Sequence, residues 1–298
     1  MTTGDDPGTA TAIAAAVCAG RLKAVDVARA ALARIRQDNE KLNAFTAVTA
    51  ERAMAEAVRV DAQIARGLDP GPLAGVPFAV KNLFDIAGLT TVAGSRINRD
   101  KPPARRDAAA VIRLNRAGAV LLGALNMDEY AYGFTTENSH DGPCRNPHDL
   151  TRVAGGSSGG SGAAVAGGLV PLTLGTDTNG SIRVPSSFCG TFGLKPTYGR
   201  LTRAGAAPFV SSLDHIGPLA RSVADIATAF DVMQGPDAND PVCTGRPAEP
   251  TLLRLGAGAS GLRVALAGDY FTRGAEPEAY DAVPRVAEVA VRGSGDGP

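Results

Sequence analysis

Two glycine-rich turns built around serines constrain this chain more than any other feature. They read Gly155-Gly156-Ser157-Ser158-Gly159-Gly160-Ser161 and Gly175-Thr176-Asp177-Thr178-Asn179-Gly180-Ser181-Ile182-Arg183, with an apolar segment between them. Glycine lets the backbone adopt positive φ and approach a ligand closely. Successive backbone N–H groups at such a turn can bind an anion, which is what an oxyanion hole requires. A serine in the middle of such a turn is therefore a candidate nucleophile.

The residue that removes the proton of this serine is either a histidine or a lysine. Ser157 and Ser158 both fit a nucleophile-elbow pattern, and the histidine downstream of both is His215. The alternative is Lys81, which follows the apolar segment Val76–Val80. A lysine at the edge of an apolar strand is desolvated, which lowers its pKa, and a neutral lysine can accept a proton. The spacing alone also allows Lys81 to be a surface residue at the end of a strand.

Lys81 and the two serine turns together resemble the amidase signature family of serine hydrolases. The similar stretch runs from about residue 70 to about 235 and includes Asn126–Tyr130, Thr136–Ser139 and Gly193–Arg200. Asn179 stands where most members have glycine. Together with the segment Pro208–Pro218, it is most similar to members that act on small carboxylated urea-type amides such as 1-carboxybiuret.

This resemblance implies a Ser–Ser–Lys triad that works without metal or cofactor. Ser181 would attack the amide carbonyl, and neutral Lys81 would take its proton through Ser157. The family usually has a cis peptide bond before the residue that matches Ser157. The oxyanion hole would consist of the backbone N–H groups of Thr178, Asn179, Gly180 and Ser181.

Other residues near the turns support weaker interpretations. Asp177 and Arg183 flank the nucleophile, and a pair that fixes the turn is favoured over a contact with substrate. Ser158 and Ser161 are expected to satisfy local backbone groups. The resemblance also places three residues in segments that border the substrate pocket, with no single role for each: Tyr130, Thr136 and Arg152.

Composition excludes several classes of protein. The 298 residues are 44% hydrophobic, enough for a substantial core. The 30 basic and 30 acidic residues balance, which argues against a broad surface for nucleic acid or membrane. The four cysteines lack metal-ligand spacing and are expected to be free thiols in a reducing compartment. With an acidic start that is unlike a signal peptide, this predicts a cytoplasmic location.

The pattern of apolar residues predicts an α/β fold formed by one domain over residues 1–298. Residues 1–70 form a helical segment, 71–235 the catalytic core, and 236–298 the beginning of an incomplete C-terminal part. In the family the sheet is mixed and helices cover both of its faces. Helices are expected over 9–19, 25–42, 51–66, 108–117, 161–167, 223–233 and 277–291, and strands over 76–80, 119–125, 171–175 and 262–267.

Members of the family are longer than this chain, so we expect its C-terminal part to be missing and the domain to be truncated. The predicted function is hydrolysis of a linear amide of the urea type. One alternative is the glutaminase component of a tRNA-dependent amidotransferase, which releases ammonia from glutamine. An alternative of another class is an inactive truncated form or an anion-binding protein. The resemblance also suggests a small helical partner subunit or a homodimer.

Overall fold

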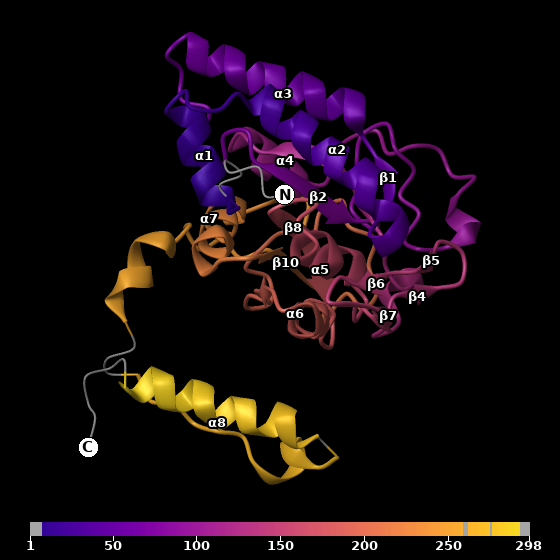
Figure 1. Ribbon diagram of the computed structural model, residues 1–298, viewed down its shortest axis with the longest axis vertical. Helices are drawn as coiled ribbons and strands as arrows, with labels where there is room; N and C mark the ends of the chain where they lie inside the picture. The colour runs from indigo at the N-terminus through magenta and orange to yellow at the C-terminus, as the bar shows by residue number, and fades with distance from the viewer. Residues whose placement is uncertain (1–7, 259–261, 275, 293–298) are drawn as a thin grey trace. The chain divides into compact units, whose positions relative to one another are not determined.

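The chain falls into two compact units, Met1–Glu249 and Pro250–Pro298. The computed structural model describes residues 8–258, 262–274 and 276–292 (Figure 1). The boundary at Glu249 lies inside the 236–298 segment that the sequence sets apart from the catalytic core. The prediction that the chain forms a single domain stays a prediction.

A mixed sheet of six strands forms the centre of the first unit. Strand β2 runs parallel to β3 and β8, whereas β10 is antiparallel to β8. Every residue of β2, β3 and β8 is buried, which explains why these strands appear as continuous apolar runs in the sequence. The order across the sheet is β1 (Phe45–Val48), β3 (Val120–Leu125), β2 (Pro77–Lys81), β8 (Leu172–Asp177), β10 (His215–Ala220) and β9 (Phe192–Gly193).

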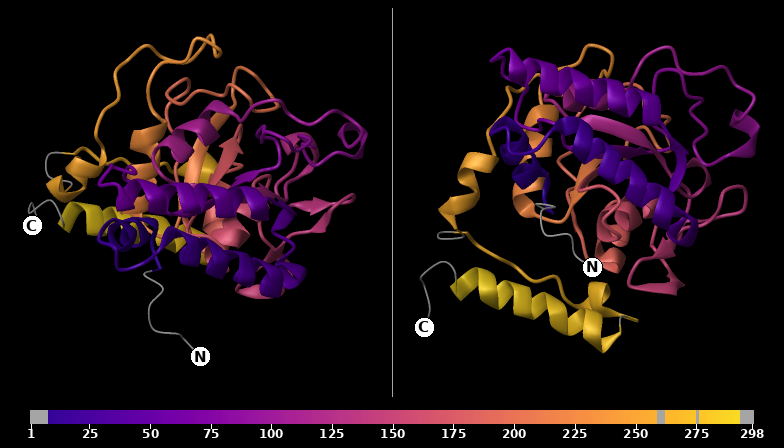
Figure 2. Two further views of the ribbon diagram at one scale, coloured as in Figure 1. Left: turned by 90° about the horizontal axis from the view of Figure 1, so that it is seen from above. Right: turned by 45° about the horizontal axis from the view of Figure 1, so that its top comes forward.

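Helices cover both faces of this sheet. The connection from β2 to β3 contains α4, and the connection from β3 back across β2 to β8 contains α5. Because such crossovers between parallel strands are right-handed and these two step in opposite directions, α4 and α5 lie on opposite faces. Figure 2 shows the helices on either side of the strands. The helices of this unit are α1 (Ala10–Cys18), α2 (Ala24–Leu42), α3 (Ala50–Ala65), α4 (Ala109–Arg116), α5 (Gly159–Ala166), α6 (Arg183–Cys189) and α7 (Val223–Met233).

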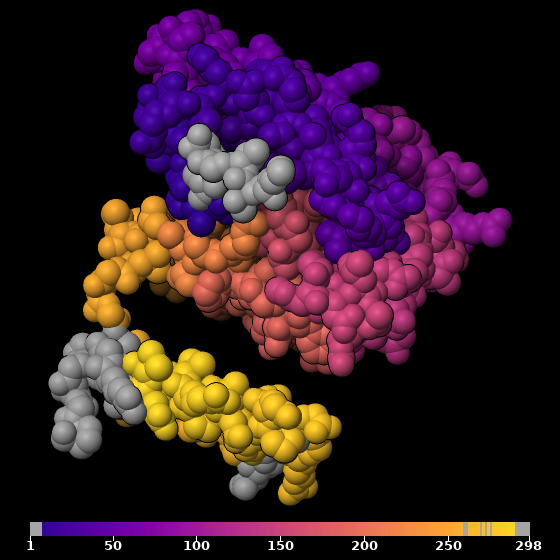
Figure 3. All heavy atoms as spheres, viewed as in Figure 1, coloured from indigo at the N-terminus to yellow at the C-terminus, as the bar shows by residue number. Residues whose placement is uncertain are grey.

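The N-terminal helices belong to the same hydrophobic core as the sheet. Ile13, Val17, Leu32 and Ile35 are buried and pack with the strand residues. In α2, Ala28, Leu32 and Ile35 recur at the helical period, which turns one face of the helix toward the core. Figure 3 shows these helices, in indigo, in continuous contact with the segments that follow them.

Short elements connect the larger ones. Two-stranded ribbons are formed by β4 (Glu137–Asn138) with β5 (Gly142–Pro143), and by β6 (Arg145–Asn146) with β7 (Asp149–Val153). Single 3₁₀ turns cover Arg96–Asn98 and Glu129–Ala131, and the second unit contains 3₁₀ turns at Leu252–Ala257 and Asp269–Thr272 and helix α8 (Pro277–Arg292). Within the described ranges, no helix combines the length and apolar character needed to cross a membrane.

The structure confirms most of the predicted elements and corrects one. All seven predicted helices are present, with ends that shift by one to a few residues. The strand predicted over Leu262–Ala267 is wrong: these residues have no regular structure. An apolar run becomes a strand only when a neighbouring strand pairs with its backbone groups. Sequence reasoning missed β1, β10 and α6.

Candidate active site

Lys81 lies at the end of β2 with its amine enclosed in the protein. Its side chain is fully buried, and Nζ lies 2.7 Å from Ser157 Oγ and 2.9 Å from Thr176 Oγ1. Burial lowers the pKa of Lys81 to about 7, although the negative charges of nearby carboxylates act in the opposite direction. A large fraction of this amine is therefore uncharged near neutral pH and able to accept a proton.

The turn that carries Ser157 leads into α5 and is packed against neighbouring backbone. The peptide bond between Gly156 and Ser157 is cis, as the family resemblance implied. Gly155 has φ of +80°, and a Cβ at this position would lie 2.8 Å from Pro185 Cα. Only glycine therefore fits this position of the turn. As expected, Ser158 Oγ and Ser161 Oγ donate to backbone carbonyls of β8.

The turn that carries Ser181 is held by the buried carboxylate of Asp177. This carboxylate accepts the N–H groups of Gly180 at 2.7 Å and Ile182 at 3.1 Å, and Arg183 Nη2 lies 2.9 Å from it. Burial acts to raise the pKa of Asp177, but the hydrogen bonds from Arg183, Ile182 and Gly180 outweigh it and the pKa is lowered. Asp177 and Arg183 thus fix the turn, as the sequence predicted.

The two serine turns meet directly, since Ser158 N donates to Ser181 O at 3.2 Å. Among the described residues, Ser181 Oγ forms no hydrogen bond, and neither do the N–H groups of Asn179 and Ser181. The N–H of Gly180, in contrast, donates to Asp177. The predicted oxyanion hole stays a prediction, and Asn179 and Ser181 offer its uncommitted donors.

A cavity of about 290 Å³ lies beside Ser181. Aromatic side chains form much of its wall, and the rings of Tyr132 and Phe209 have their centroids 5.7 Å apart. The residues lining this cavity are Ala131, Tyr132, Gly133, Phe134, Thr178, Asn179, Ser181 and Phe209. The site can therefore present a hydroxyl and free N–H groups to a small ligand between aromatic walls.

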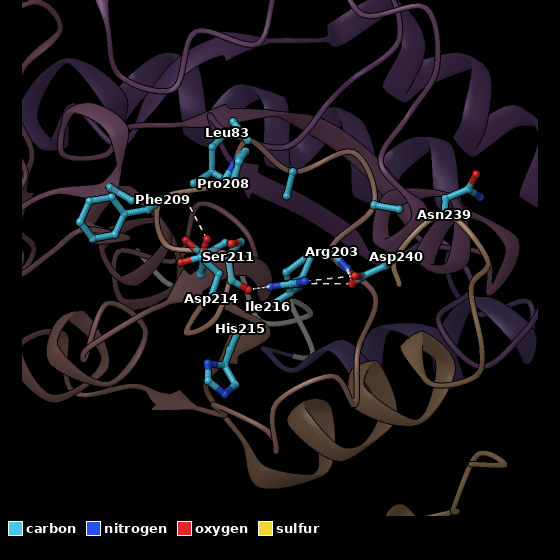
Figure 4. A pocket seen from close by; sticks show the side chains of 15 residues that line it. Leu83, Arg203, Pro208, Phe209, Ser211, Asp214, His215, Ile216, Asn239 and Asp240 are labelled. Atoms are coloured by element: carbon cyan, nitrogen blue, oxygen red, sulfur yellow. Dashed lines mark hydrogen bonds and ion pairs between the residues drawn. The ribbon is translucent and has the colours of Figure 1, made fainter. Parts of the chain in front are cut away.

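A second cavity, of about 180 Å³, shares Ala131 and Phe209 with the first (Figure 4). Thr176 lines it, so it extends toward the amine of Lys81. At its polar end Arg203 forms an ion pair with Asp240 at 3.1 Å, which Figure 4 marks with dashed lines.

His215 also lines this second cavity but is not bonded to either serine by its side chain. Its Nδ1 lies 2.6 Å from Leu213 O and 3.0 Å from Asp177 O, and its ring meets Tyr198 edge-on. A base must lie within hydrogen-bond reach of the proton it takes. The geometry therefore favours Lys81 over His215 as the base.

The three weaker candidates occupy different environments. Tyr130 is partly exposed, and its hydroxyl lies 3.2 Å from Asn98 Oδ1. Thr136 is fully buried, and its Oγ1 accepts the N–H of Gly159 at 3.1 Å. The Arg152 side chain is 78% exposed, and its Nε lies 3.3 Å from a carboxylate oxygen of Asp149. None of the three is among the described residues that line the cavity beside Ser181, and their contact with substrate stays a prediction.

Comparison with known proteins decides the family. The family model for amidases matches residues 26–291. The chain belongs to the amidase family. Its mixed sheet with covering helices agrees with solved amidase-type structures, so the predicted fold class is confirmed.

Relatives of this amidase-family chain include proteins of two activities. It is 60% identical to AtzE of Pseudomonas sp. (strain ADP), a component of 1-carboxybiuret hydrolase, over 90% of this chain and 58% of that protein. It is 50% identical to GatA-type glutamyl-tRNA(Gln) amidotransferase of Anaeromyxobacter dehalogenans (strain 2CP-C) over 87% of this chain and 53% of that protein.

One similar solved structure belongs to a vestigial protein complex that reveals the evolutionary origins of an s-triazine catabolic enzyme. It has a TM-score of 0.93 and 57% identity, and the match covers 95% of this chain and 62% of that one. The chain thus spans between half and two thirds of the length of these amidase-family relatives.

Sequence reasoning assigned no role to two residues of this amidase site, Thr176 and Asp128. Thr176 gives Lys81 a second hydrogen-bond partner, and Asp128 is a buried carboxyl beside the Ser157 turn. The pairing of β2 with β8 brings Thr176 to Lys81, and no sequence pattern reports that pairing. In the described part of the chain, no group of His, Cys, Asp and Glu residues is arranged to hold a metal ion.

Proposed function

We propose that this chain carries the catalytic residues of an amidohydrolase that cleaves a linear C–N amide bond through an acyl-enzyme. The observation that carries the proposal is the buried, largely uncharged amine of Lys81 at 2.7 Å from Ser157 Oγ, on the turn that contacts the Ser181 turn. An uncharged amine is a base, and Ser–Lys pairs are an established variant of serine catalysis.

In this mechanism Ser181 Oγ attacks the carbonyl carbon of the amide. Its proton passes to Ser157 Oγ, while the Ser157 proton passes to Lys81 Nζ. The bond between Ser157 and Ser181 forms when substrate binds, because catalytic hydrogen bonds often tighten only in that complex. The N–H groups of Asn179 and Ser181 stabilise the oxyanion.

The same relay then works in reverse. Lys81 returns its proton through Ser157 to the leaving nitrogen, and the C–N bond breaks. Water next attacks the ester on Ser181, giving up its proton to the relay, and the acid is released.

Labelling with a fluorophosphonate probe tests the triad, because such probes phosphorylate an activated serine. We expect the probe to label Ser181 in the wild-type chain. Lys81→Met, Ser157→Ala and Ser181→Ala should each abolish most labelling while melting as cooperatively as the wild type. A wild-type chain that binds anions but is never labelled would instead support the anion-binding alternative.

For substrate we propose a small carboxylated urea-type amide such as 1-carboxybiuret. The 60% identity to AtzE supports this choice over glutamine, since the identity to the amidotransferase is 50%. Measuring ammonia release from 1-carboxybiuret and from glutamine separates the two. Faster turnover of glutamine would reverse the assignment.

For assembly we propose a small helical partner subunit or a homodimer. The similar solved chain that belongs to a protein complex supports the proposal. Co-purification from the source cell followed by a mass measurement tests it. A chain of monomeric mass with no second protein bound would reject it.

A further inference from the structure

Asp128 is a buried carboxyl that lies directly against the turn of Ser157. The residue is 8% exposed, and its Oδ1 accepts the N–H of Thr136 at 2.9 Å. A Cβ added to Gly156 would lie 2.1 Å from Oδ2, so this oxygen packs against the glycine that precedes Ser157. Within the described residues, the buried Oδ2 has no hydrogen-bond partner. Such an atom is costly unless a nearby charge compensates for it.

The backbone of Asp128 joins the serine turn to the wall of the cavity. Asp128 N donates to Ser157 O at 3.3 Å, and Asp128 O accepts the N–H of Ala131 at 2.9 Å. A Cβ at Gly133 would lie 2.5 Å from Asp128 Cγ. Ala131 and Gly133 both line the cavity beside Ser181. One residue thus contacts both the turn of the relay serine and the segment that faces the ligand.

Three carboxylates act on the charge of Lys81, and two of them have other partners. These are Asp128, Asp177 and Asp214. Asp177 is paired with Arg183. Asp214 accepts the Thr178 hydroxyl at 2.5 Å and the N–H groups of residues 209 and 210.

The remaining ionisable group that senses Asp128 is the thiol of Cys144. Burial raises its pKa well above the ordinary value, so this thiol stays neutral. Burial likewise raises the pKa of Asp128, while the N–H of Thr136 and the charge of Lys81 favour the carboxylate. Asp128 is therefore the carboxylate with charge left to offer the amine.

We propose that Asp128 is a positioning residue of this site. It holds the Ser157 turn against the cavity wall, and its negative charge stabilises Lys81 while Lys81 holds the serine proton. Asp128 takes no proton itself: the proton lost by Ser181 reaches Lys81 Nζ through Ser157, and the carboxylate lowers the free energy of the resulting ammonium. The inference rests on the proposed function, since it needs Lys81 to act as the base.

The pH dependence of fluorophosphonate labelling tests this role with Asp128→Asn, which keeps the shape and removes the charge. Without the carboxylate the ammonium of Lys81 is less stable, so its pKa falls. The midpoint of the rise in labelling rate should move down by about one pH unit, and the plateau rate should fall about tenfold because the base is weaker.

Glu129→Gln is the matched control, because it removes the neighbouring charge from a group that hydrogen-bonds Ser95 at the surface. We expect its midpoint to equal that of the wild type. A midpoint for Asp128→Asn equal to that of Glu129→Gln would overturn the role of the charge. Absence of labelling at Ser181 in the wild type would instead reject the proposed function, so the two failures are distinct.

A second measurement keeps the test valid if Asp128→Asn labels too slowly to follow. Melting temperatures of Lys81→Met, Asp128→Asn and the double variant form a cycle that needs no activity. The two residues should be coupled strongly at about pH 6, where Lys81 is charged, and weakly at about pH 9, where it is neutral. Equal coupling at both pH values would overturn the proposal.

Discussion

Replacing Thr176 with valine should slow the reaction of Ser181 without dismantling the site. Lys81 Nζ lies within hydrogen-bond distance of two hydroxyls, Ser157 Oγ at 2.7 Å and Thr176 Oγ1 at 2.9 Å. A neutral amine that donates a hydrogen to Thr176 turns its lone pair toward Ser157. Valine has nearly the shape of threonine and suits a buried strand, but it cannot accept this hydrogen.

The structure sets the size of the effect. An unsatisfied buried donor costs about 1–3 kcal/mol. If the whole cost falls on the transition state, labelling slows by about 5- to 150-fold, because about 1.4 kcal/mol corresponds to a tenfold change in rate. The assay is the pseudo-first-order rate of fluorophosphonate labelling at a pH where Lys81 is neutral, together with the melting temperature of each variant.

Thr173→Val provides a matched control on the same strand. Thr173 is fully buried, and its Oγ1 donates to Ser161 O at 3.1 Å, so this variant also loses one buried hydrogen bond. Both variants should lose similar stability, and only Thr176→Val should lose reactivity. Equal labelling rates for the two variants would refute the idea that Thr176 orients the amine.

Two other predictions follow from the charges at the site. Since burial lowers the pKa of Lys81 to about 7, the labelling rate should rise with pH through about 7, and a rate independent of pH there would contradict a lysine base. Between about pH 7 and its ordinary value of 10.5, Lys81 is protonated only in the unfolded chain. It should therefore make the free energy of unfolding rise with pH in that window, a slope that Lys81→Met removes in denaturant titrations. Asp177→Asn should lower stability by about 1–3 kcal/mol in the same titrations, because an amide cannot accept from both Arg183 and the turn. Labelling should fall with it, and an unchanged rate would show that this carboxylate does not hold the nucleophile.

Much of the larger unit could be predicted from the sequence because its elements carry local patterns. Helix α2 repeats its apolar residues at the helical period, and β2 and β3 are short apolar runs. Strand β10 was missed because its segment, His215–Ala220, contains glycine and proline, which disfavour strands in general. It forms because every residue pairs with the buried strand β8. The run at Leu262–Ala267 shows the converse, since apolar character without a partner produces no strand.

The sequence by itself determined which side chains are available for the chemistry: two serines in glycine-rich turns, one lysine after an apolar strand, and an aspartate and arginine around the nucleophile. Glycine and proline patterns are local, so they can be read along the chain. The tertiary structure alone decided that Lys81 is enclosed, that Thr176 is its second partner, and that Asp128 lies against the Ser157 turn. Burial, and with it the pKa of an amine, depends on atoms that are distant in sequence and that only the folded chain brings together.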